Sequence, residues 1–321
     1  MDTQKGLLED LIKHVAKQVN GIGDAAAGAV AVYFGSLELF LVASQGDLEK
    51  IKNIKEHQIL SDKQISGLLS LIAVLPKNYG IRGLWVSLLV GDFIKSAEEN
   101  LKSINLDNLM LNPLLIRALN MKSANHVLDF FLYQSISRSI VTSWGMRVEE
   151  ILVKSGAEHI PRNEPGGFDI KKVVGDLVYY IQVKSGTNTM NVDMIRYLNQ
   201  KLTELETINP NMKGVLGLTY GKRNQVSGQI MGNLADPEER LKVGEELWDF
   251  ISGEEGYFFK VLDILAETSR NRLKKNFFDQ IIEKYDEIRA EWVNRYHGLD
   301  EESVDLFMNE YLGTTQRGNA K

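Results

Sequence analysis

Two patterns of hydrophobic positions follow each other along the chain. Over residues 1–156 the apolar residues recur at helical spacing, as in LEDLIKHVAKQV and SDKQISGLLSLIAVL. Between residues 166 and 221 three runs rich in β-branched and aromatic residues, FDIKKVV, LVYYIQVK and KGVLGLTYG, predict strands. An amphipathic segment, VDMIRYLNQKLTELETI, separates the second run from the third and predicts a helix. Helical spacing then returns and continues to about residue 298.

This order predicts an α/β protein with one small mixed β-sheet flanked by helices and with helical N-terminal and C-terminal additions. We divide the chain into a helical region for recognition or dimerisation (1–122), an α/β core (123–270), C-terminal helices packed on the core (271–312) and a disordered tail (313–321). Residues 123–156 are interpreted as two helices broken near residues 135–143, and KRNQVSGQIMGN as a basic and polar loop.

The first two strand runs flank Gly175-Asp176, a pair typical of a two-residue hairpin turn in which both residues adopt positive φ. With that turn, Val174 pairs with Leu177, and counting back along both strands sets Asp169 opposite Gln182. This register is decisive, because a slip of one residue would move every side chain to the other face.

Side chains alternate between the two faces of a strand. We therefore expect Asp169, Gln182 and Lys184 on one polar face, at the end of the hairpin away from the turn. The opposite face is expected to be core and to carry Phe168, Ile170, Val174, Leu177, Tyr179, Ile181 and Val183, with Lys172 as the exception.

Composition and charge exclude several classes of protein. The 321 residues are 44% hydrophobic and 25% charged, as in ordinary globular proteins. The chain has no cysteine, which excludes disulfides and thiolate metal sites and fits a reducing cytosol. We recognise no secretory signal, and the most apolar run, residues 30–44, is shorter than the roughly 20 residues of a membrane span. The net charge of −6 disfavours non-specific nucleic-acid binding but allows a local basic cleft.

A carboxylate, an amide and a lysine on neighbouring strands have a chemical use. Mg²⁺ prefers oxygen ligands, which Asp169, Gln182 and the backbone carbonyl of Val183 would supply. Lys184 would then face the attacking water and stabilise its hydroxide form. The pattern indicates a site for phosphodiester hydrolysis. The alternative is a half-solvated sheet face on which Asp169 and Lys184 form a cross-strand ion pair.

The chain resembles the PD-(D/E)xK nuclease superfamily in three features. These are Asp169, the segment QVKSG that follows it after twelve residues, and a preceding helix with Glu149 and Glu150. Over about residues 110–270 the chain is also similar to type II restriction endonucleases. The segments that carry this similarity are GMRVEEIL, FDI, IQVKSGTNTMN, LGLTYGK and GEELWDFISGEEGY. The chain departs from the pattern at Phe168, where a proline is usual, and at Gln182, where an acid is more frequent, so it resembles the QxK variant. One fewer negative charge weakens metal binding, and Glu149 or Glu150 would compensate. Glu149 fits the family's Gly-x-x-x-Glu spacing and ranks first.

The resemblance implies Mg²⁺-dependent, sequence-specific hydrolysis of double-stranded DNA that leaves 5′-phosphate ends. It implies Mn²⁺ as a substitute and Ca²⁺ as an ion that supports binding without cleavage. A homodimer on a palindromic site, a cognate DNA methyltransferase and a prokaryotic cytoplasmic location follow from the same likeness. The alternatives are a structure-specific or repair nuclease of the same fold, and a DNA-binding relative that has lost catalysis.

Two segments that follow predicted strands carry candidate DNA contacts. The first follows Lys184 and contains Ser185, Thr187, Asn188, Thr189 and Asn191. The second follows the third strand and contains Tyr220, Lys222, Arg223, Asn224 and Gln225. Amides, hydroxyls and cations of this kind contact phosphates and base edges. The same residues are also ordinary loop formers, so a solvated turn is the alternative for both segments.

Overall fold

The computed structural model describes residues 2–54, 57–75 and 77–311. Within it the chain forms two compact units. Unit 1 consists of Met1–Gly91 and Gly145–Arg272, and unit 2 of Asp92–Trp144 and Leu273–Lys321. Each unit combines segments that are distant in sequence. The division of the chain into a helical region, an α/β core and C-terminal helices with separate functions stays a prediction. The predicted disordered tail falls outside the described residues.

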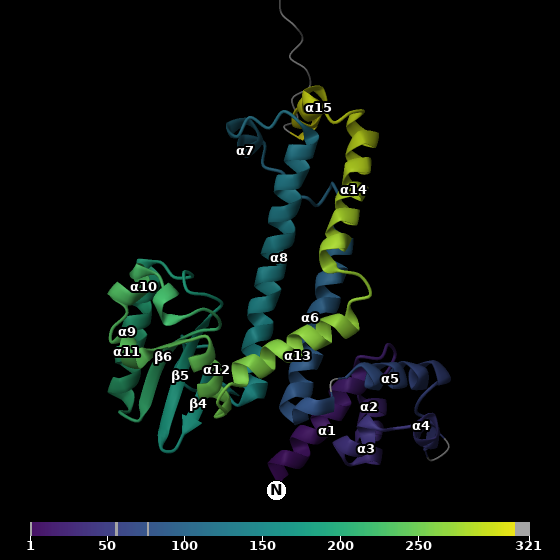
Figure 1. Ribbon diagram of the computed structural model, residues 1–321, viewed down its shortest axis with the longest axis vertical. Helices are drawn as coiled ribbons and strands as arrows, with labels where there is room; N and C mark the ends of the chain where they lie inside the picture. The colour runs from purple at the N-terminus through teal and green to yellow at the C-terminus, as the bar shows by residue number, and fades with distance from the viewer. Residues whose placement is uncertain (1, 55–56, 76, 312–321) are drawn as a thin grey trace, which may run out of the picture. The chain divides into compact units, whose positions relative to one another are not determined.

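The sheet of unit 1 has five strands in the order β3-β4-β5-β6-β7 (Figure 1). The strands are β3 (Glu158–His159), β4 (Ile170–Val174), β5 (Leu177–Lys184), β6 (Met212–Leu218) and β7 (Leu241–Val243). The pairs β3-β4 and β4-β5 are antiparallel, whereas β5-β6 and β6-β7 are parallel. The predicted mixed α/β fold, with helical regions before and after the sheet, is therefore confirmed. The two short edge strands, β3 and β7, were not anticipated.

Helices cover both faces of this sheet (Figure 1). Leu198 and Leu202 of α9 (Val192–Ile208) form a buried cluster with Leu216 and Leu218 of β6. On the other face, Leu247 of α12 (Glu245–Ser252) packs against Gly217. This double cover explains why β6 reads as a nearly continuous apolar run, as expected for a parallel strand buried on both faces.

Gly214 in β6 allows Leu202 of α9 to pack directly against the strand. We expect Gly214→Val to destabilise the fold by about 1–3 kcal/mol. A Cβ atom at this position would lie 2.1 Å from Cδ2 of Leu202. The free energy of unfolding in urea measures the effect. Gly166→Val is the matched control, because a Cβ at Gly166 has no atom within 4 Å. Equal stability of the two variants would contradict this view of the packing.

The N-terminal part of unit 1 is a separate helical layer with its own core. It contains α1 (Asp2–Lys17), α2 (Asp24–Phe34), α3 (Leu37–Leu41), α4 (Gln45–Lys52), α5 (Asp62–Val74) and the start of α6 (Gly80–Ser103). Leu11, Phe40 and Leu68 are fully buried in this core together with Leu84 and Leu88 of α6. A two-residue strand pair, β1 (Asn53–Ile54) and β2 (His57–Gln58), and a 3₁₀ turn (Lys77–Tyr79) complete the layer.

Unit 2 is entirely helical in the described residues. It consists of the second half of α6, α7 (Pro113–Ala118), most of α8 (Ala124–Ser155), α14 (Phe277–Tyr296) and α15 (Glu301–Tyr311). Its core centres on Trp292, which is fully buried and stacks with Tyr296 and Phe307 at ring-centroid distances of 4.8 and 5.2 Å. The indole N–H of Trp292 donates to the hydroxyl of Ser303.

Three predictions about helices are corrected. The break predicted near residues 135–143 does not occur, because α8 is continuous and Ile136 in that stretch is buried in the unit 2 core. The single helical stretch after residue 244 is instead divided into α12, α13 (Tyr257–Arg272) and α14, with turns between them. The segment predicted as a loop contains a 3₁₀ turn (Arg223–Gln225) and α10 (Gly228–Asn233), which Ser227 caps, and is followed by α11 (Pro237–Arg240). No helix in the described part of the chain is long and apolar enough to cross a bilayer.

Candidate active site

The hairpin has the predicted register. Val174 pairs with Leu177 and Ile170 with Ile181, where the paired register ends. Just beyond it, the side chains of Asp169 and Gln182 meet in a hydrogen bond. The backbone N–H of Asp169 donates to the carbonyl of Ile181, the residue that already pairs with Ile170, so the ladder becomes irregular just before β4. The turn differs from the prediction in one respect: Gly175 has φ +58°, whereas Asp176 does not adopt positive φ.

The Asp169 carboxylate is held by two donors from β5. Its Oδ2 atom accepts a hydrogen bond of 2.5 Å from the Gln182 side-chain amide and one of 2.6 Å from the backbone N–H of Val183. Both donors approach the same oxygen, so Oδ1 remains available to another partner. The amide of Gln182 donates through Nε2, which leaves its Oε1 atom free to act as an oxygen ligand.

Glu149 of α8 joins this group. Burial raises the pKa of the Glu149 carboxyl, and the negative charge of Asp169 raises it further, while Lys184 lowers it in part. The electrostatic influence of both residues shows that α8 brings Glu149 within range of the Asp169–Lys184 pair. The structure therefore gathers Glu149, Asp169, Gln182 and Lys184 at the carboxyl end of β5.

The donor set fits a hard cation better than a transition metal. Among the described residues no cluster of three or more His, Cys, Asp or Glu side chains is arranged to hold a metal ion. A divalent cation here would use the Asp169 and Glu149 carboxylates and the amide oxygen of Gln182, which is an all-oxygen set. Such ligands suit Mg²⁺, which keeps several waters and needs few protein ligands.

One face assignment of the hairpin is wrong. The ring of Phe168 lies 5.9 Å from that of Tyr180 and packs in the cluster beneath α9, on the face that also carries Gln182. Phe168 lies before the start of β4, so the alternation of side chains along that strand does not determine which face it occupies. Tyr180 itself is 1% exposed, because α9 and the preceding loop cover a face that the sequence indicated as polar and solvated.

A second polar cluster lies beside the site and was missed from the sequence. Glu164, in the loop before β4, accepts hydrogen bonds from the Lys171 ammonium at 2.6 Å and the Tyr180 hydroxyl at 2.8 Å. The hydrogen bond from Lys171, followed by that from Tyr180, lowers the pKa of Glu164. Burial, followed by the bond to Glu164, raises the pKa of Tyr180 to about 12. Acids in loops give no periodic signal, so the sequence does not indicate this contact.

The two loops predicted to contact DNA lie against each other. The backbone N–H of Ser227 donates to the carbonyl of Thr187 at 2.9 Å. The hydroxyl of Tyr220 packs so closely over Gly186 that a Cβ there would lie 2.6 Å from it. Both loops follow the carboxyl ends of parallel strands, the edge at which Lys184 pairs with Leu218. Ligands of open α/β sheets bind at this kind of edge.

Several candidate DNA-contacting residues have structural partners in this structure. Asn191 caps α9 by accepting from the backbone N–H of Met194, Thr189 donates to the carbonyl of Gly186, and Gln225 accepts from the backbone of Lys222. Arg223 donates to the carbonyls of Pro237 and Leu241 and reaches the carboxylates of Glu238 and Glu246. Their contacts with DNA stay predictions. Asn188, Tyr220, Lys222 and Asn224 are exposed, whereas Ser185 and Thr187 are half-buried.

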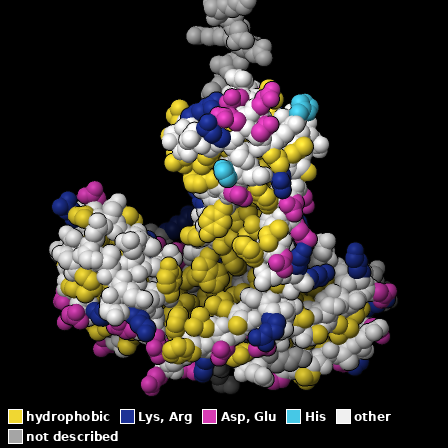
Figure 2. Space-filling view, turned by 45° about the horizontal axis from the view of Figure 1, so that its top comes forward, with side chains coloured by type: hydrophobic (Ala, Val, Ile, Leu, Met, Phe, Trp, Pro, Cys, Tyr) yellow, Lys and Arg dark blue, Asp and Glu magenta, His cyan; other side chains and the backbone are white. Residues whose placement is uncertain are grey.

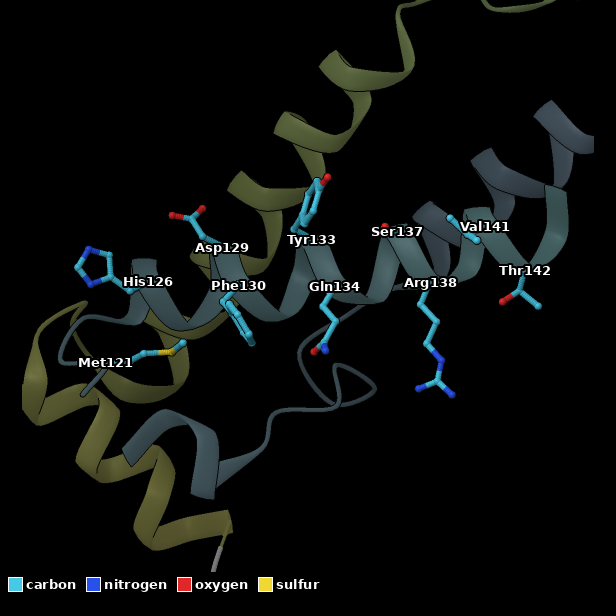
Figure 3. A pocket seen from close by; sticks show the side chains of 10 residues that line it. All are labelled: Met121, His126, Asp129, Phe130, Tyr133, Gln134, Ser137, Arg138, Val141 and Thr142. Carbon is cyan, nitrogen blue, oxygen red and sulfur yellow. The ribbon is translucent and has the colours of Figure 1, made fainter. Parts of the chain in front are cut away.

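A groove of different character lies elsewhere, on unit 2 (Figure 3). It has a volume of about 900 Å³ and is lined mainly by one face of α8, with Phe130, Gln134, Arg138 and Val141 among the lining residues. Figure 2 shows hydrophobic side chains gathered on the surface of this region, where Tyr133 and Val141 are 68% and 59% exposed. The groove holds a single carboxylate, that of Asp129, so its chemistry differs from that of the Asp169 group.

We expect Glu149→Gln to stabilise the metal-free protein at neutral pH. A carboxyl whose pKa is higher in the folded state than its ordinary value of 4.5 binds more protons when folded. The free energy of unfolding therefore falls as pH rises from about 4.5 through the raised value. Glutamine removes this penalty, so the gain over wild type is present at pH 7 and disappears below pH 4.5. Thermal unfolding in chelator across this pH range measures it, with Glu150→Gln as control. A variant less stable than wild type at pH 7 would refute the explanation.

A mixed sheet with an acid, an amide and a lysine at the end of its antiparallel pair, and a helix acid beside them, defines a restriction-endonuclease-like core. Residues 84–273, more than half of the chain, match the family described as Type II restriction endonuclease EcoO109I. The chain belongs to this family of restriction endonucleases, which are nucleases acting on DNA. Comparison with curated proteins gives no significant match.

Proposed function

We propose that the protein is a type II endonuclease that cuts double-stranded DNA at a specific sequence with the help of Mg²⁺ and leaves 5′-phosphate and 3′-hydroxyl ends. The observation that carries the proposal is the convergence of Asp169, Gln182, Lys184 and Glu149 at one end of β5. Membership of the restriction endonuclease family supports the substrate class.

In this proposal Asp169 is the anionic ligand of the cation, and Gln182 and the Val183 carbonyl are neutral ligands. Glu149 supplies the second negative charge, which replaces the acid that Gln182 does not provide. When bound, Mg²⁺ supplies Lewis-acid catalysis and lowers the pKa of a coordinated water. Mn²⁺ is expected to substitute for it, and Ca²⁺ to support DNA binding without cleavage.

Lys184 and Asp169 have distinct tasks in the reaction. The Lys184 ammonium stabilises the hydroxide form of the attacking water and the charge that develops on the phosphoryl oxygens. The two hydrogen bonds to Oδ2 hold the Asp169 carboxylate in one orientation, so little reorganisation is needed when the site is loaded. Preorganisation of this kind gives polar groups their catalytic effect.

The loops after β5 and β6 would contact the DNA. Exposed Lys222 would meet a phosphate, and exposed Asn188 and Asn224 would read base edges. A palindromic target matches a homodimer with two-fold symmetry. The helical regions at residues 1–122 and 271–312 would then serve recognition or dimerisation. A cognate methyltransferase would protect the host DNA, and the enzyme would act in a prokaryotic cytoplasm.

Digestion of a plasmid of known sequence tests the proposal. With Mg²⁺ we expect discrete fragments, and with chelator none. Sequencing of the fragment ends then gives the recognition site, its length and the stagger of the cut. Smears or cutting at branched junctions would instead identify a structure-specific or repair nuclease. Binding without any cleavage would identify a DNA-binding relative in which the amide at residue 182 has removed activity.

A further inference from the structure

The rung of the hairpin next to the candidate site carries a lysine. Lys171 pairs with Tyr180, and Gln182, the next residue of β5 on the same face as Tyr180, donates from its side chain to the Asp169 carboxylate. Same-face neighbours on one strand lie about 6.6 Å apart, because a strand rises about 3.3 Å per residue. A lysine side chain easily spans this distance. The Lys171 ammonium therefore lies within reach of the carboxylate that would bind the cation.

Glu164 holds this ammonium in another direction. Its Oε1 atom lies 2.6 Å from Nζ of Lys171, and its Oε2 atom accepts the hydrogen bond from Tyr180. The Lys171 side chain is only 13% exposed, so the pair is shielded from solvent. Glu158 also approaches Lys171, but at 3.8 Å and with 59% of its own side chain exposed, which makes it the weaker partner.

We propose that Glu164 is a positioning residue that sequesters the Lys171 ammonium and thereby keeps the Asp169 carboxylate available to a divalent cation. This inference rests on the metal site of the proposed function. Without the charge of Glu164, the ammonium would turn to Asp169 and compete with the cation for the same carboxylate. Tyr180 fixes the geometry, because its buried hydroxyl binds the second oxygen of Glu164 and stops the carboxylate from following the lysine.

A binding titration without DNA tests this role. Free Mn²⁺ is followed by its electron paramagnetic resonance signal while the full-length protein is added. We expect Glu164→Gln to weaken Mn²⁺ binding by about tenfold, the scale on which partners of metal ligands act. The double variant Glu164→Gln/Lys171→Met should bind Mn²⁺ as wild type does, because it lacks the competing ammonium. A loss due only to a displaced loop would not be restored by removing the lysine.

Two controls separate the possible failures. Glu158→Gln removes only the weaker, exposed partner of Lys171 and should retain Mn²⁺ binding, and thermal unfolding confirms that each variant is folded. Unchanged binding by Glu164→Gln, or no recovery in the double variant, overturns the inference while wild-type binding that depends on Asp169 leaves the metal site intact. If wild type and Asp169→Ala bind Mn²⁺ equally, or neither binds, the metal site itself is wrong and the inference falls with it.

Discussion

Lys184→Ala is expected to reduce DNA cleavage by about 10²–10³-fold or more, the effect of removing one preorganised charge from a transition state. Lys184 is the one cation of the Glu149–Asp169–Gln182–Lys184 group, so no other member of the group replaces its charge. Binding of DNA in Ca²⁺ should be largely retained, because the exposed loop residues remain. Cleavage rates on a defined fragment and gel shifts in Ca²⁺ measure the two properties separately.

Lys213→Ala is the matched control for this variant. Lys213 is also a half-buried lysine of the sheet, but it pairs with Tyr179 in the part of β6 away from the site. It should cut DNA at the wild-type rate. The assignment of Lys184 fails if Lys184→Ala cuts as fast as Lys213→Ala.

Substitutions of Asp169 are expected to have the second large effect, on cleavage and on stability together. Asp169→Asn and Asp169→Ala both remove the anionic ligand and should abolish cleavage and Mn²⁺ binding. Only alanine also leaves the Gln182 amide and the Val183 N–H without their acceptor. Unpaired buried donors of this kind cost about 1–3 kcal/mol. We therefore expect Asp169→Ala to lose that much stability, and Asp169→Asn much less.

Asp176→Asn serves as the control, because Asp176 is exposed at the turn of the same hairpin, at the opposite end from the site. It should retain cleavage, Mn²⁺ binding and stability. Urea unfolding, metal titration and fragment analysis on the three variants provide the comparison. Cleavage by Asp169→Asn at the wild-type rate would remove this residue from the mechanism.

The hairpin was predictable because its determinants are local. A turn at Gly175-Asp176 and the period of two predict the register of Ile170–Val174 on Leu177–Ile181, and Asp169 meets Gln182 just beyond its end. Gly-x-x-x-Glu spacing likewise selected Glu149, which the fold places beside Asp169 and Lys184. The class of fold followed from the order of periodic segments.

Tertiary packing decided the features that could not be predicted. The serines around Ile136 indicated a break, but packing of Ile136 in the unit 2 core keeps α8 continuous. The hairpin face that the sequence indicated as polar also carries Tyr180, which is buried and bonded to Glu164 of the preceding loop. The same loop brings Glu164 to Lys171, a contact that has no sequence period. Arg223 donates hydrogen bonds to the carbonyls of Pro237 and Leu241. Leu241 begins β7, a strand of three residues that is too short to recognise in the sequence.

The bond from the Val183 N–H to Asp169 has a practical consequence. This amide proton points at the carboxylate proposed to bind the cation, and it belongs to a buried residue of β5. In an isotopically labelled sample its nuclear magnetic resonance signal is therefore an intrinsic sensor of occupancy. Ion loading can be followed at a single backbone position, without substrate and without any added probe.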